Sequence, residues 1–207
     1  MVEALEIVEK GVKVGEYWLK DIGFADDQGM VVEMEQGLRN IMNRLNNVSK
    51  EYGMKINIKK TKVMRVSKQG GGNLHIVLDE ERIKQVTQYC YLGSLITDNG
   101  SCSKEIRART AMAKTAFNRR KEFLTRGISR KVKKMIIKTV VWSVLLYGSE
   151  TWSLTSEDIR KIEAFEMWTW RRMEKVRWVE RKTNEEVVKM VDEKRGLINR
   201  ITRNKKR

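Results

Sequence analysis

The spacing of apolar residues changes near residue 100, and this change constrains the fold more than any other feature of the 207-residue chain. Before it, short apolar runs alternate with turns and with one helical segment. After it, apolar residues recur at intervals of three and four, which is the spacing of an amphipathic helix. The chain contains no proline, so only glycine punctuates these segments. The pattern predicts an α+β chain, mixed over residues 1–100 and all-helical over residues 101–207.

The first part is expected to hold several short strands and one helix. Residues 33–52 place apolar side chains on one helical face, and Gly53 follows as a helix stop. A glycine triplet at residues 70–72 predicts a loop. Strand-like patterns occur at residues 12–19, 22–25, 30–32, 56–66, 74–78 and 90–97.

The second part is expected to consist of four helices, with Ser156 as the N-cap of the third. On the first of them, four apolar residues form one stripe, and Arg107, Lys114 and Lys121 recur every seven residues beside it. The apolar stripe residues are Ile106, Ala113, Phe117 and Leu124. The four expected helices span residues 104–125, 129–147, 156–176 and 183–201.

The net positive charge of the chain lies entirely in the second part. Residues 101–207 contain 29 Lys and Arg against 13 Asp and Glu, whereas residues 1–100 contain 14 of each, and the net charge is +16. Such an imbalance predicts a polyanion partner held by the helical part. A highly charged, solvated helical surface is the alternative. Trp178, between Arg177 and Arg181, is the tryptophan most expected to be exposed, and an aromatic beside basic residues can stack a base.

Composition excludes several classes of protein. Cys90, Cys102 and His75 are the only cysteines and histidine, which is too few for a closed zinc site or a disulfide framework. The acidic N-terminus does not resemble a secretory signal. The longest apolar run, residues 135–147, is shorter than the ~20 residues that cross a bilayer. An intracellular protein that does not enter a membrane is therefore expected, with nucleus and cytoplasm not distinguished.

Two adjacent carboxylates, Asp26 and Asp27, follow Phe24-Ala25 at the end of a short apolar stretch. Mg²⁺ prefers hard oxygen ligands and usually takes one or two carboxylates together with substrate phosphates. Two such ions can stabilise the attacking and the leaving oxygen of a phosphoryl transfer. The same residues are also typical of an ordinary polar turn between two strands.

The order of the downstream motifs favours the first interpretation. After the helix at residues 33–52, the sequence contains Gly53-Met54-Lys55-Ile56-Asn57-Ile58-Lys59-Lys60-Thr61-Lys62 and then Tyr91-Leu92-Gly93. In this order the motifs resemble the reverse transcriptases of non-LTR (LINE-type) retrotransposons. The resemblance implies an RNA-directed DNA polymerase, a nucleotidyltransferase that uses Mg²⁺. It also implies a partial palm, made of a short antiparallel sheet and one helix, followed by a thumb-like helical bundle.

The resemblance assigns roles to particular residues. Asp26 and Asp27 match the metal-binding carboxylates, and Lys60 matches a strand lysine close to the phosphates of the incoming nucleotide. The hairpin that supports the primer end matches Tyr91, Leu92 and Gly93. From the residues alone, Lys60 could equally be a lysine that protects a strand edge. In the helical part, Arg107, Lys114 and Lys121 are expected to contact phosphates of an RNA template or an RNA–DNA primer-template duplex.

Part of the polymerase site is missing from the sequence. The family needs a further metal-binding Asp and a fingers region, which would precede Met1, and Asp21 is the only other acid near the turn. Gln28-Gly29 also departs from the family pattern. The expectation is a C-terminal fragment, inactive alone, whose partner could be the missing upstream half. The alternative is a non-catalytic nucleic-acid-binding helical module derived from such an element.

Overall fold

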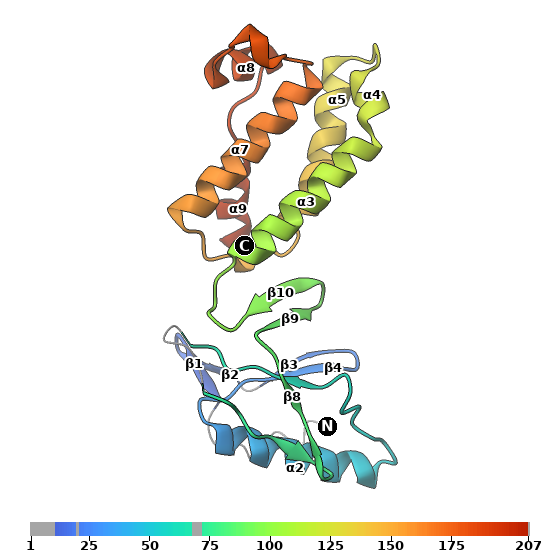
Figure 1. Cartoon of the computed structure of the whole chain (residues 1–207), viewed down its shortest axis with the longest axis vertical. Helices are drawn as coiled ribbons and strands as arrows, with labels where there is room; N and C mark the ends of the chain where they lie inside the picture. The colour runs from blue at the N-terminus through green and yellow to red at the C-terminus, as the bar shows by residue number, and fades with distance from the viewer. Residues whose placement is uncertain (1–10, 20, 68–71, 207) are drawn as a thin grey trace. The chain divides into compact units, whose positions relative to one another are not determined.

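The computed structural model of the protein describes residues 11–19, 21–67 and 72–206 (Figure 1). The predicted α+β class is confirmed, because short strand pairs and one helix precede a series of helices. The chain forms two compact units, Met1–Tyr89 and Cys90–Arg207, so the division lies about ten residues before the change in apolar spacing. No helix in the described ranges is both long and apolar enough to cross a membrane.

The first unit contains strands that pair two by two instead of forming one sheet. Three of the pairs are antiparallel hairpins. The fourth is a parallel pair of strands that are distant in sequence. The antiparallel pairs are β1 (Val12–Val14) with β2 (Tyr17–Leu19), β3 (Asp21–Phe24) with β4 (Asp27–Met30), and β6 (Val77–Leu78) with β7 (Glu81–Arg82). The parallel pair is β5 (Lys62–Val63) with β8 (Lys84–Gln85).

Four of the strand predictions for this unit are wrong in extent. Strand β4 ends at Met30 instead of covering residues 30–32, and the strand expected at residues 74–78 is reduced to Val77–Leu78. Residues 12–19 form two strands and a turn at Gly15, whose φ of +62° suits glycine. The predicted strand at residues 56–66 is reduced to Lys62–Val63, and residues 58–60 form a turn. Of the predicted glycine loop, residues 70 and 71 lie outside the described residues.

Helix α2 (Glu35–Glu51) contributes one face to a small core in this unit. Ile41, Met42 and Leu45 are buried, as their spacing predicts, while Met34 precedes the helix and is exposed. Met42 packs in a cluster with Val63, Leu74, Ile76, Leu78 and Ile83. Asp79 accepts hydrogen bonds from Asn46 (2.8 Å) and Lys50 (2.6 Å), which fixes the β6–β7 turn to the helix.

The second unit is built mainly from helices that share one core. One hairpin precedes them, formed by the end of β9 (Gln88–Tyr91) and by β10 (Ser94–Thr97). The helices are α3 (Ser103–Arg119), α4 (Lys121–Thr125), α5 (Arg130–Ile136), the π-helical η1 (Ile137–Val141), α6 (Trp142–Leu146), α7 (Ser156–Met173), α8 (Asn184–Val191) and α9 (Leu197–Lys205). Two short 3₁₀ segments, η2 (Ser149–Thr151) and η3 (Trp178–Glu180), lie between them.

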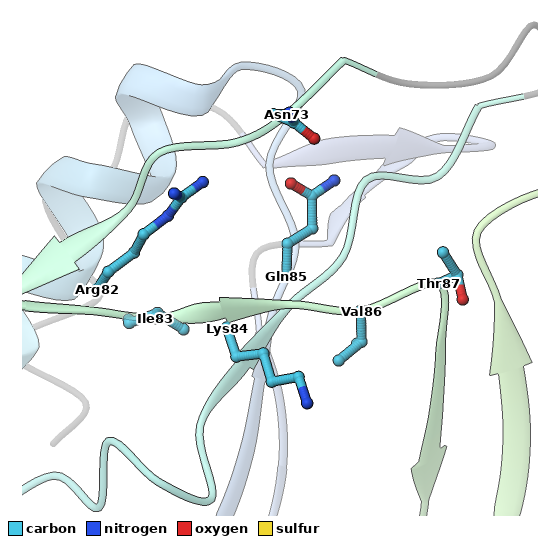
Figure 2. A pocket seen from close by; sticks show the side chains of 7 residues that line it. All are labelled: Asn73, Arg82, Ile83, Lys84, Gln85, Val86 and Thr87. Carbon is cyan, nitrogen blue, oxygen red and sulfur yellow. The ribbon is translucent and has the colours of Figure 1, made fainter.

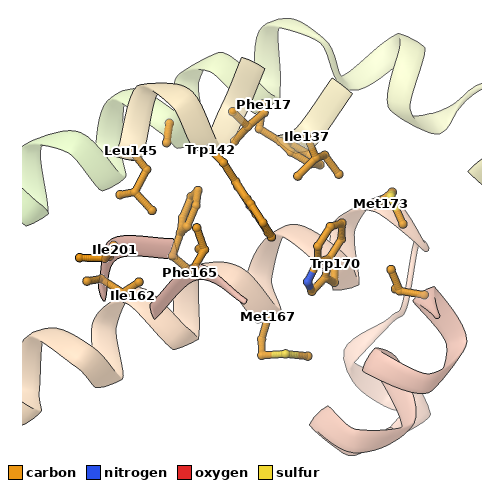
Figure 3. Packing of buried hydrophobic residues seen from close by; sticks show 14 of the residues in the cluster. Phe117, Ile137, Trp142, Leu145, Ile162, Phe165, Met167, Trp170, Met173 and Ile201 are labelled. Atoms are coloured by element: carbon orange, nitrogen blue, oxygen red, sulfur yellow. The ribbon is translucent and has the colours of Figure 1, made fainter. Parts of the chain in front are cut away.

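Tryptophan and aliphatic side chains fill this core (Figure 3). The rings of Trp142 and Trp170 meet edge to face with 5.5 Å between their centroids, and both are almost fully buried. The burial predicted for the apolar stripe is confirmed, because all four of its residues are buried: Ile106, Ala113, Phe117 and Leu124. The first three lie on α3, whereas Leu124 lies on α4. The core therefore forms where the helical periodicity predicts it.

Helix boundaries are where the prediction for this unit fails. The expected helix at residues 183–201 is two helices, because Asp192 adopts a left-handed φ of +55° and ends α8. Lys134 donates to the carbonyl oxygens of Val191 (3.1 Å) and Asp192 (3.0 Å), which satisfies that helix end. Helix α7 is capped by Thr155 instead of Ser156, in a capping box with Asp158.

A buried carboxyl group joins α7 to the start of α9. The backbone N–H groups of Gly196 (2.9 Å) and Leu197 (3.4 Å) donate to the Glu166 carboxylate, whose side chain is 1% exposed. Burial raises the pKa of Glu166 above its ordinary value of 4.5, although the two N–H groups act in the opposite direction. Ionised Glu166 therefore costs the folded state free energy.

This pKa shift predicts a pH dependence of stability. In the unfolded chain Glu166 ionises near pH 4.5, whereas in the folded protein it ionises at a higher pH. The free energy of unfolding therefore falls as pH rises from 4.5 through the raised pKa. We expect Glu166→Gln to remove this component, so that the difference in free energy of unfolding between variant and wild type grows with pH. Urea unfolding at several pH values between 4.5 and 7.5 measures it, and parallel pH profiles would contradict it. The lowered pKa of Asp158, which has the opposite sign, acts below this window.

Candidate functional site

The acidic pair lies at the tip of the β3–β4 hairpin. Phe24 pairs with Asp27, so Ala25 and Asp26 are the two residues of the turn, and both carboxylates are exposed. Ala25 has φ +51°, as the first central residue of the turns favoured by two-residue hairpins requires. The local geometry therefore presents two adjacent carboxylates to solvent on a short, defined loop.

The carboxylates at this tip fit part of a magnesium site. Two hard oxygen donors are what Mg²⁺ takes from a protein when phosphates and water complete its coordination. Asp21 pairs with Met30 at the other end of the hairpin, about 10 Å away at the usual strand rise of ~3.4 Å per residue. Among the residues that the structure describes, no group of three Asp, Glu, Cys or His side chains could hold a metal. The donors present are Asp26 and Asp27.

Lys60 is not on a strand, contrary to the prediction. It is exposed at the end of a turn, and its backbone N–H donates to both the carbonyl and the side-chain oxygen of Asn57 (3.1 Å each). This Asn-centred turn explains why the alternating pattern is interrupted there. Within the described residues, no hydrogen bond or ion pair joins Lys60 to Asp26 or Asp27. The structure thus does not bring the predicted catalytic lysine and the acidic pair together by direct contact.

A shallow hollow in the first unit lies along β8 and contains none of the predicted site residues (Figure 2). Its polar side chains form hydrogen bonds with the adjacent backbone at residues 72–74. Gln85 accepts from the N–H of Leu74 (2.7 Å) and donates to the carbonyl of Gly72 (3.4 Å), and Arg82 donates to the carbonyl of Leu74 (3.3 Å). The hollow is therefore explained by packing of residues 72–74 against β8.

The Tyr-Leu-Gly segment forms the turn of the β9–β10 hairpin. Tyr91 ends β9, and Leu92 (φ +47°) and Gly93 (φ +80°) make the turn. Both turn carbonyls are held by side chains of the same unit. Tyr147 Oη donates to the oxygen of Leu92 (2.7 Å), and Arg109 Nη2 donates to the oxygen of Gly93 (2.5 Å). The turn is thus fixed in place instead of being a free loop.

Glu105, Arg109 and Tyr147 form what we call the hairpin anchor. Arg109 Nε lies 2.8 Å from Glu105 Oε1, and its guanidinium stacks 4.4 Å from the centre of the Tyr147 ring. Glu105 also accepts from the N–H of Leu95 (2.9 Å). Glu105 is 4% exposed and Arg109 is 9% exposed, so this is a buried ion pair in which both partners are hydrogen-bonded. The anchor is not among the predicted site residues, although an Arg that interrupts the apolar stripe four residues after a Glu is a signal for it.

The three basic residues at seven-residue intervals are all exposed, but they do not lie on one helix. Arg107 and Lys114 lie on α3, whereas Lys121 begins α4 after the break at Arg120. Lys114 Nζ is 5.5 Å from the centre of the Trp168 ring. The continuous basic row predicted along one helix is therefore wrong beyond Arg119, while the exposure of each cation remains compatible with phosphate contact.

Comparison with known proteins shows a distant similarity. The chain is 27% identical over 147 residues to a transposon-derived protein of Caenorhabditis elegans. The similarity covers 69% of this chain and 53% of that protein, so the chain spans about half the length of the curated relative it matches. No family model matches the sequence, and no solved structure matches it either. The name of that protein describes it as transposon-derived, and the similarity supports a transposable-element origin for this chain.

Proposed function

We propose that the chain is part of the reverse transcriptase of a non-LTR retrotransposon, comprising the second half of the palm, the thumb and a helical extension. The observation that carries this proposal is the exposed Asp26–Asp27 pair at the tip of a two-residue hairpin turn. The fixed Tyr-Leu-Gly turn and the similarity to a transposon-derived protein support it. The substrate class is an RNA template or an RNA–DNA primer-template duplex with deoxynucleotides.

In this proposal Asp26 and Asp27 are the residues that would hold Mg²⁺. The metal supplies charge stabilisation for phosphoryl transfer when it is bound. The hairpin supplies the two oxygen donors on a short turn, and the anchored turn at Leu92–Gly93 supports the primer end. Two carboxylates are an incomplete ligand set for a polymerase. The remaining Asp and the fingers region come from an upstream polymerase half, and the chain alone does not polymerise.

We expect Asp26→Asn/Asp27→Asn to abolish Mg²⁺-dependent primer extension by the chain combined with its upstream polymerase half. Each change replaces an anionic donor of the metal, so the loss should exceed the roughly 10–100-fold cost of removing an outer-shell partner. The measurement is extension of a labelled primer on an RNA template with Mg²⁺ and deoxynucleotides. RNA affinity, measured in parallel by gel shift, should be unchanged.

Asp21→Asn is the matched control, because it makes the same chemical change at the opposite end of the same hairpin. It should leave extension within a few-fold of wild type. Full extension by the Asp26→Asn/Asp27→Asn variant would disprove the metal role. Efficient synthesis by the isolated wild-type chain would disprove the proposal that it is inactive alone.

A second candidate function is a non-catalytic nucleic-acid-binding module, which the positive charge of residues 101–207 favours. The two functions differ in the acidic turn. A module would bind RNA equally well with or without Asp26 and Asp27, and no addition of an upstream half would produce extension. If neither RNA nor duplex shifts in a gel at low salt, both functions are excluded.

A further inference from the structure

Trp178 is the most exposed large apolar side chain of the described residues. It is 93% exposed and its neighbour Val179 is 78% exposed, whereas Trp142, Trp152 and Trp170 are buried in the same unit. Exposing an indole forgoes the stabilisation that its burial would give. A protein unit that buries three tryptophans but leaves this one in water has a surface that is available for a flat aromatic partner.

The segment around Trp178 is braced against the helices. We call residues 175–182 the Trp178 loop. Its first part is tied to α7 by the Val176 N–H, which donates to the carbonyl of Arg171 (2.9 Å), and by packing of Val176 on the core. The Arg171 guanidinium donates to the carbonyl of Lys182 (2.8 Å) at the other end. The loop is thus held at both ends, which keeps the indole on the surface.

The charge of the Trp178 loop selects an anionic partner. Lys175, Arg177 and Arg181 are exposed and lie within three residues of Trp178 in the sequence. Glu180 is the only acid in the loop, and it is engaged by the Lys182 ammonium (2.8 Å) and by the N–H of Arg177 (2.8 Å). Basic side chains beside an exposed aromatic are the combination that binds single strands, because cations contact the backbone and the ring stacks a base.

We propose that Trp178 stacks an unpaired base of single-stranded nucleic acid, with Arg177, Arg181 and Lys175 on the flanking phosphates. The inference deepens the proposed function, on which it rests, by assigning the single-strand contact to this loop. It commits to a single strand because the bases of a duplex are already stacked on one another and do not present a free face to an indole. A purely electrostatic patch would bind the duplex at least as well, since the duplex has the higher charge density.

The test is the affinity of the full chain for a labelled single-stranded RNA of about 12 nucleotides, a length within the usual range of single-strand sites. A duplex of the same length is the comparison. We expect Trp178→Ala to weaken single-strand binding by roughly 5- to 150-fold, the cost of losing one stacked base. Duplex affinity should change less than about twofold. Trp178→Tyr, which keeps an aromatic face, should retain most of the affinity.

The controls separate stacking from charge and from general RNA binding. Trp18→Ala removes a half-exposed tryptophan of the other unit and should have no effect. Arg181→Ala should lower the dependence of log affinity on log salt by about 0.7, one phosphate contact on a single strand, whereas Trp178→Ala should leave this slope unchanged.

Three results would overturn the inference. One is equal single-strand affinity of Trp178→Ala and wild type, and another is an equal loss on single strand and duplex. The third is that Trp178 drives binding to phosphatidylserine vesicles and not to RNA. A wild-type chain that binds no RNA would instead contradict the proposed function, so the two failures are distinguishable.

Discussion

Replacing Arg109 with alanine is expected to destabilise the second unit by about 3–5 kcal/mol, the cost of breaking a buried ion pair from one side. The variant leaves the Glu105 carboxylate buried without its cation and frees the carbonyl of Gly93. It also removes the guanidinium from the Tyr147 ring. The free energy of unfolding, from urea titration followed by circular dichroism, measures the effect.

Two further variants show whether the loss arises from the buried charge. Arg107→Ala removes an exposed arginine from the same helix and should change stability by less than about 0.5 kcal/mol. Glu105→Gln/Arg109→Met removes both charges and should be more stable than Arg109→Ala alone, because no unpaired ion remains. If Arg109→Ala costs no more than Arg107→Ala, the hairpin anchor does not stabilise the unit.

The same anchor shows why part of the candidate site could not be predicted from the sequence. The two positive-φ residues of the Tyr-Leu-Gly turn are local, and the motif indicates them directly. Arg109 has one local partner, Glu105, but its other two partners, Gly93 and Tyr147, lie 16 and 38 residues away along the chain. A buried charge is tolerable only when its partners are in place, so the sequence alone shows a Glu–Arg pair at helical spacing without the distant groups that allow its burial.

The elements of the fold that depend on nearby residues could likewise be predicted from the sequence, whereas those that depend on distant residues could not. The helical stripe through Phe117 and the acidic turn at Asp26 were predicted because periodicity and turn chemistry act within a few residues. The strand expected at residues 56–66 was wrong because an alternating pattern does not reveal where a pairing partner is available. The break at Asp192 was missed because it depends on Lys134, which caps the end of α8 from another helix.

Trp170→Ala is expected to destabilise the protein by about 3–5 kcal/mol, whereas Trp178→Ala should change stability by less than about 0.5 kcal/mol. The two variants delete the same side chain from the same unit. Trp170 is fully buried and meets the Trp142 ring at 5.5 Å, so its removal leaves a large cavity and ends an aromatic contact. Trp178 is 93% exposed, and its removal leaves no cavity.

Urea unfolding and near-ultraviolet circular dichroism of both variants measure this difference, and similar losses in the two would contradict the burial of the core. The comparison also decides how RNA affinities are interpreted. A variant that unfolds loses affinity for single strands and duplexes alike, because the whole basic surface is disrupted. Trp178→Ala at wild-type stability can lose affinity only through the contact it removes, so a selective loss on single strands identifies Trp178 as the residue that stacks the base.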